Sequence, residues 1–182
     1  MSEPKAMIDP TQDYFTLFGL RRLFRLDLGA LEAAYHELHS VVHPDRHAAR
    51  PEAERRRAMQ EAAFVNEAFV ALKQPLERAR YLLQLAGETS GEQSNIAMAP
   101  AFLMEQMEWR EAIDEARQAA DGDELTALAQ RLRERERHQF ERLAGMLDDE
   151  HDYPAAAEQV RRLMFMRRLD QDIDDALEAL ED

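Results

Sequence analysis

The 182-residue sequence contains no cysteine. This absence excludes disulfide bonds, thiolate metal ligands and a cysteine nucleophile. No apolar run approaches the roughly 20 residues that a membrane-spanning helix needs, which argues against a membrane protein. The N-terminal residues, MSEPKAMIDP, lack the apolar core of a signal peptide. We therefore expect a cytoplasmic protein that does not bind membranes.

Basic residues are scarce as well, with 23 Lys and Arg against 37 Asp and Glu, a formal net charge of −14. An acidic chain without a long basic tract argues against nucleic-acid binding. The charge is unevenly distributed: residues 1–86 hold 12 basic and 12 acidic residues, whereas residues 87–182 hold 11 and 25. All of the net charge therefore lies in the second half, which suggests two modules with different surfaces.

Glycine and proline are few, and their positions support this division. Residues 87–100 read GETSGEQSNIAMAP, with two glycines, one proline and no sustained apolar periodicity. Such a stretch is typical of a linker. We place a first module at residues 1–86, a linker at 87–98 and a second module at 99–182.

Apolar periodicity predicts helices in the first module. Asp27 is a suitable N-cap, and Leu31, Tyr35, Leu38 and Val42 follow at spacings of four, three and four. A second helix is expected from about residue 52, with the buried stripe Met59, Ala62, Ala63, Asn66, Phe69 and Val70. The two helices can pair as a hairpin, and a short helix follows at 76–87.

The second module shows three long helical patterns with short connections. Pro100 suits the first turn of a helix over about 100–121, Gly122 is expected to end it, and Asp123 is expected to cap the next helix. A turn at 148–154 precedes the last helix. An antiparallel three-helix bundle is the simplest arrangement, so the predicted fold class is all-α.

The turn of the predicted hairpin contains His43, Pro44 and Asp45, within HSVVHPDRHAAR. Pro44 has no N–H and disfavours helical dihedrals at His43, so the helix breaks there. The break leaves the imidazole and the carboxylate at the tip of the hairpin, where both can face a partner. The alternative is a helix stop with incidental polar residues, because a motif of three residues arises easily by chance.

The surrounding order of features favours a functional motif. It resembles the J-domain of DnaJ-type co-chaperones. The residues that carry this resemblance are Tyr14, Leu17, Leu20, His43, Pro44, Asp45, Asn66, Ala68, Phe69 and Leu72. The segments DYFTLFGL, PLERARYLL and AFLMEQMEWRE together resemble the HscB family, the J-type co-chaperones of bacterial iron–sulfur cluster assembly, over nearly the whole chain from about residue 12.

The predicted helix over 100–121 has two apolar faces. At about 100° per residue, its core stripe consists of Phe102, Trp109, Ile113 and Ala116. A second apolar group falls on the opposite side and is flanked by glutamates: Leu103, Met104, Met107, Glu108, Glu111 and Glu115. Phe165, off the main stripe of the last helix, is expected to extend this group.

An exposed apolar patch flanked by carboxylates is typical of a protein-binding site. The alternative is that both faces are buried, against the first module or against a second copy of the chain.

The resemblance implies two protein partners. His43, Pro44, Asp45 and Arg46 would contact an HscA-type ATPase chaperone of the DnaK class and stimulate its ATP hydrolysis. The iron–sulfur scaffold protein IscU would bind Leu103, Met104, Met107, Glu108, Glu111, Glu115 and Phe165, which match the family's pattern. The chain would then be no enzyme, would need no cofactor or metal, and would be a monomer or a weak dimer.

One feature departs from the J-domain pattern. In J-domains, the helix before the HPD motif (here His43, Pro44 and Asp45) usually presents a basic face to an acidic patch on the chaperone. Residues 28–42 contain no lysine or arginine, and positive charge appears only at Arg46, Arg50 and 55–57. Docking is therefore expected to be weaker, to be shifted towards the loop and the following helix, or to depend on pH through histidine protonation.

Two other functions remain open. A generic J-type adaptor would deliver a different client to the chaperone. A metal-dependent enzyme would use His36, His39, His43 and His47, whose spacings of three, four and four place them on one side of a continuous helix. The break at Pro44 and the absence of an H-E-x-x-H pattern count against the metal site.

Overall fold

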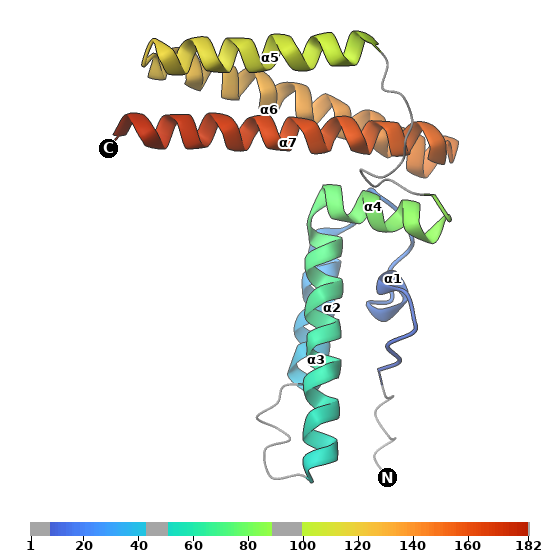
Figure 1. The fold of residues 1–182 in the computed structure, drawn as a ribbon. Helices are drawn as coiled ribbons and strands as arrows, with labels where there is room; N and C mark the ends of the chain where they lie inside the picture. The colour runs from blue at the N-terminus through green and yellow to red at the C-terminus, as the bar shows by residue number, and fades with distance from the viewer. Residues whose placement is uncertain (1–7, 43–50, 89–99, 182) are drawn as a thin grey trace. The chain divides into compact units, whose positions relative to one another are not determined.

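The computed structural model describes residues 8–42, 51–88 and 100–181, and all regular secondary structure in these ranges is helical (Figure 1). The first helices are α1 (Tyr14–Leu17), α2 (Leu28–Val42), α3 (Glu52–Lys73) and α4 (Pro75–Leu85). They are followed by α5 (Pro100–Gln118), α6 (Gly122–Ala144), the π-helical turn η2 (Gly145–Glu150) and α7 (Tyr153–Glu181). Within the described ranges, no helix combines the length and the apolarity needed to cross a membrane.

The chain forms two compact units, residues 1–82 and 83–182. Most of the predicted linker at 87–98 lies outside the described residues, so the proposed limits of the modules stay a prediction. The all-α fold class is confirmed for the described parts of the chain.

In the first unit, α2 and α3 form the expected hairpin (Figure 1). The ring of Tyr35 stacks on Phe69 with centroids 4.0 Å apart, and its hydroxyl lies 3.0 Å from Asn66 Oδ1. Lys73 Nζ lies 3.1 Å from Glu32 Oε1. Residue numbers rise along α2 as they fall along α3, so the two helices are antiparallel and residues 43–50 connect them.

The buried side of α3 differs from the expected stripe. Met59 and Val70 are 61% and 58% exposed, and of the six expected residues only Ala62 is buried. The residues that α3 buries are Ala58, Ala62, Val65, Ala68 and Leu72. Three of these five are alanines, whose small side chains let neighbouring helices approach closely. The expected stripe was chosen by the polarity of the side chains alone, and its assignment of Met59 and Val70 to the core was wrong.

Side-chain caps explain where the first helices begin. Asp13 accepts hydrogen bonds from the backbone N–H groups of Phe15 and Thr16, both at 3.1 Å, at the start of α1. Arg22 Nη2 donates to the same carboxylate at 2.8 Å. Burial alone would raise the pKa of Asp13, but the hydrogen bonds from Arg22 and Thr16 outweigh it and lower the pKa to about 2. The expected N-cap of α2 is confirmed, because the N–H of residue 30 donates to Asp27 Oδ1 at 3.0 Å.

In the second unit, α5, α6 and α7 pack as the expected three-helix bundle (Figure 1). Both α6 and α7 bury an apolar stripe along their length. Their largest fully buried side chains are Leu125, Leu128, Leu132 and Leu143 from α6 and Leu163, Leu169 and Ile173 from α7.

The junction between α5 and α6 lies slightly earlier than predicted. Asp121, rather than Asp123, caps α6 and accepts a hydrogen bond from the N–H of Glu124 at 2.9 Å. The left-handed residue after α5 is Ala120, with φ of 53°, whereas Gly122 is the first residue of α6. The predictions for Gly122 and Asp123 were wrong because the carboxylate of Asp121 already caps α6 two residues earlier, so that Gly122 is part of the helix.

Candidate partner-binding sites

The two faces of α5 are confirmed as one buried and one exposed face. Phe102, Ile113 and Ala116 are buried in the bundle. On the other face, Leu103, Met104 and Met107 are 47%, 63% and 70% exposed. Three large apolar side chains exposed together on one helix face are typical of a protein-binding surface. We call Leu103, Met104, Met107, Glu108, Glu111 and Glu115 the α5 outer face.

The glutamates of the α5 outer face are free to meet a partner. Glu108, Glu111 and Glu115 are exposed, and none of them forms an ion pair with another described residue. By contrast, Glu105 on the side towards α6 is paired with Arg135. The negative charge of the α5 outer face is therefore available for a basic partner.

Phe165 differs from the expectation that it would extend this face. It is only 7% exposed, and its ring meets that of Phe102 edge-on with centroids 5.7 Å apart. The guanidinium of Arg110 lies 5.7 Å from the same ring. Because α7 packs against both α5 and α6, a residue off its main stripe is still enclosed. In the isolated chain, Phe165 is largely enclosed beneath α5, and its part in scaffold binding stays a prediction.

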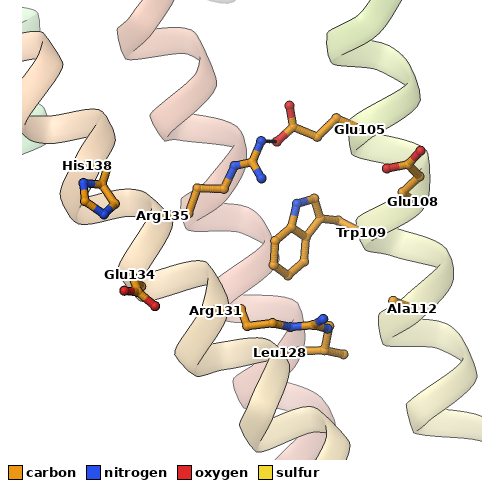
Figure 2. Close-up of a pocket in the computed structure, with 9 residues that line it drawn as sticks. All are labelled: Glu105, Glu108, Trp109, Ala112, Leu128, Arg131, Glu134, Arg135 and His138. Atoms are coloured by element: carbon orange, nitrogen blue, oxygen red, sulfur yellow. Dashed lines mark ion pairs between the residues drawn. The ribbon is translucent and has the colours of Figure 1, made fainter.

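A groove of about 720 Å³ between α5 and α6 was not predicted from the sequence (Figure 2). Its lining includes Glu105, Glu108 and Trp109 from α5 and Arg131, Glu134 and Arg135 from α6. Figure 2 shows the indole of Trp109 between the two arginine side chains that reach across from α6. Trp109 was assigned to the core stripe, but it is only half-buried and lines this groove. The sequence signal is the row of charged residues at 131, 134 and 135, a pattern that is usually typical of an ordinary exposed helix face.

The residues predicted to contact an ATPase chaperone, His43, Pro44, Asp45 and Arg46, lie outside the described residues. The helices that flank them are described. The helix before them, α2, contains no lysine or arginine. The helix after them, α3, contains Arg55, Arg56 and Arg57 in its first turns. The antiparallel pairing of α2 and α3 confirms the predicted helix hairpin, and the position of His43, Pro44 and Asp45 stays a prediction.

The histidine alternative has little support in the described part of the chain. His36 is exposed and His39 half-buried, and their rings lie 5.5 and 5.4 Å from that of Tyr35. No group of three or more His, Asp or Glu side chains within residues 8–42, 51–88 and 100–181 is arranged to hold a metal ion. His43 and His47 lie outside these ranges.

Comparison with known proteins identifies the class of this chain. A family model described as the HSCB C-terminal oligomerisation domain matches residues 98–174. A co-chaperone protein HscB homolog from Azoarcus sp. (strain BH72) is 59% identical over 174 residues, which is 96% of this chain and 98% of that relative. One from Aromatoleum aromaticum is 58% identical over the same shares.

Solved structures agree with these relatives. The chaperone HscB from Vibrio cholerae has a TM-score of 0.81 at 37% identity, covering 93% of this chain and 99% of that one. The human co-chaperone protein HscB has a TM-score of 0.85 at 28% identity, covering 92% and 83%. The fold and the relatives thus define a helical co-chaperone rather than an enzyme. The chain belongs to the HscB family.

Proposed function

We propose that this co-chaperone binds an IscU-type iron–sulfur scaffold through the α5 outer face and delivers it to an HscA-type ATPase, whose ATP hydrolysis it stimulates through His43, Pro44, Asp45 and Arg46. The observation that supports the scaffold contact most directly is the exposure of Leu103, Met104 and Met107 beside carboxylates without ion pairs in the described chain. Unbranched methionine side chains adapt well to a partner surface. The proposal places the protein in the cytoplasm, as a monomer or weak dimer.

The two partner sites act together because they belong to one chain. Stimulation requires only that the first unit binds the hydrolysis-competent state of the chaperone more tightly than its resting state. The second unit holds the scaffold and raises its effective concentration at the chaperone. The reaction itself takes place in the partner.

The test is steady-state ATP hydrolysis by the HscA-type chaperone, with this chain and the IscU-type scaffold added separately and together. We expect synergistic stimulation by the pair. His43→Gln should abolish stimulation and leave scaffold binding intact. Met104→Ala with Met107→Ala should weaken scaffold binding and leave stimulation without scaffold unchanged.

Phe165 supplies a control for the second experiment. Because Phe165 is buried against Phe102, Phe165→Ala should lower the free energy of unfolding by about 3–5 kcal/mol, whereas exposed Met104 and Met107 should change it by less than about 0.5 kcal/mol each. Stimulation without scaffold synergy would favour the generic adaptor. No stimulation of any DnaK-class chaperone would contradict the proposal.

A further inference from the structure

We propose that the groove between α5 and α6 is a second contact of the scaffold-binding surface and that it takes a lysine or arginine side chain of the scaffold. This inference rests on the proposed function and adds residues of α6 to it. Three observations carry it: the charge left unpaired in the groove, the position of Trp109, and the continuity of the groove with the α5 outer face (Figure 2).

The unpaired charge of the groove is negative. Arg135 is paired with Glu105, and Arg131 Nη2 lies 3.4 Å from Glu124 Oε1. Glu108 and Glu134 line opposite walls, and neither forms an ion pair with a residue in the described ranges. With both arginines engaged, a ligand that enters the groove meets two carboxylates that it can neutralise. A cation is therefore favoured over an anion.

Trp109 makes the groove suited to a long basic side chain rather than to a small ion. Its indole is half-buried, and it offers apolar surface to the aliphatic stem of a lysine or arginine while the charged end stays in water at the rim. The guanidinium of Arg131 already lies 5.9 Å from the indole centroid, which shows that this ring accepts a cation beside it.

The groove is continuous with the α5 outer face because Glu108 belongs to both. Glu108 lies one helical turn after Met104. A protein that covers Met104 and Met107 therefore places neighbouring residues of its own surface at the rim of the groove. The net charge of −14 on residues 87–182 attracts a basic partner to this unit from a distance. The expected occupant is thus the scaffold protein itself, through a basic side chain adjacent to its apolar contact.

The single tryptophan of the chain permits a direct test. The full-length protein labelled with 5-fluorotryptophan gives one ¹⁹F resonance, from Trp109, even when the scaffold contains tryptophan of its own. Titration with the purified IscU-type scaffold of the same organism should shift or broaden this resonance with the Kd that calorimetry measures.

Glu134→Gln tests the groove separately from the α5 outer face. It should raise the Kd for the scaffold roughly 2- to 5-fold, an effect that 0.5 M salt reduces. Glu178→Gln is the matched control, because it removes one exposed carboxylate of the same unit from α7 and should change the Kd less than about 1.5-fold.

Equal Kd values for Glu134→Gln and Glu178→Gln overturn the inference, and so does a ¹⁹F resonance that stays unchanged while the scaffold binds. In either case the proposed function survives if Met104→Ala with Met107→Ala still weakens binding. Failure of the unaltered chain to bind the scaffold overturns the proposed function and the groove together.

Discussion

Asp13 shows how several weak interactions combine at one residue. Its carboxylate caps α1 and pairs with Arg22, and these hydrogen bonds lower its pKa from 3.8 to about 2 although burial opposes them. A lowered pKa in the folded state means that the ionised carboxylate stabilises the fold. This stabilisation is complete above the ordinary pKa of 3.8 and is lost as the pH falls towards 2.

Asp13→Asn should therefore lower the free energy of unfolding by about 1–2 kcal/mol at pH 7. Asparagine still caps a helix well, so the loss reports mainly the charge. Urea unfolding of the variant and the unaltered chain between pH 7 and pH 3 checks this: the difference between them should narrow once the pH drops below about 4.

Asp121→Asn is the matched control, because Asp121 caps α6 without an ion pair among the described residues. It should destabilise the protein less than Asp13→Asn does at pH 7. A difference between Asp13→Asn and the unaltered chain that stays constant down to pH 3 would contradict the role given to the Asp13 charge.

At the scale of the helix, the arginines of the two hairpin helices lie at the start of α3, and α2 has none. The carboxylates of α2, Glu32 and Glu37, are exposed, and α2 has no lysine or arginine. The acidic chaperone patch implied by the J-domain resemblance must then meet positive charge elsewhere. Arg55 and Arg56 are exposed in the first turns of α3, directly after the segment that contains the HPD motif.

Arg55→Glu with Arg56→Glu should raise the concentration of this co-chaperone that gives half-maximal ATPase stimulation. The expected increase is roughly 5-fold or more at low salt, because two positive charges are replaced by two negative ones. The maximal stimulation should change little, since His43, Pro44 and Asp45 are intact. ATPase titrations at 0.05 and 0.3 M salt measure both quantities.

Arg80→Glu provides the control, because Arg80 on α4 is half-buried and its guanidinium pairs with Glu77 at 3.2 Å. This substitution changes the charge by the same amount per residue as the α3 variant does, but at a position away from the start of α3. If Arg80→Glu and the α3 variant raise half-saturation equally, the effect is one of net charge and the start of α3 is not the docking site.

Much of the structure of the single helices was predictable, because the spacing of apolar residues and the capping residues are local properties of the sequence. The positions of α2, α6 and α7, the cap at Asp27 and the exposure of Met104 and Met107 all follow from spacing along one helix. The buried side of α3 and the position of Phe165 depend on which neighbours pack there, and a single-helix pattern does not contain them. The groove beside Trp109 likewise exists only because α5 and α6 lie together.

At the scale of the whole molecule, the residues of the two proposed partner sites belong to different compact units of one chain. Joining two binding modules in one chain gives an effective concentration of up to the order of millimolar for the second binding event, without any new contact. We therefore attribute the synergy that the proposed function predicts at micromolar protein to the covalent connection between the two units.

Cutting that connection tests the attribution. A variant whose residues 91–97 are replaced by a protease site of equal length can be assayed before and after cleavage. Cleavage should leave stimulation without scaffold within about 2-fold and leave scaffold binding unchanged, while the synergy at micromolar protein falls by on the order of tenfold or more, because the effective concentration is lost. The uncut variant is its own control for the replacement. If the synergy survives cleavage, the scaffold acts on the chaperone without being tethered to the first unit, and delivery by a bivalent chain is excluded even though both sites bind.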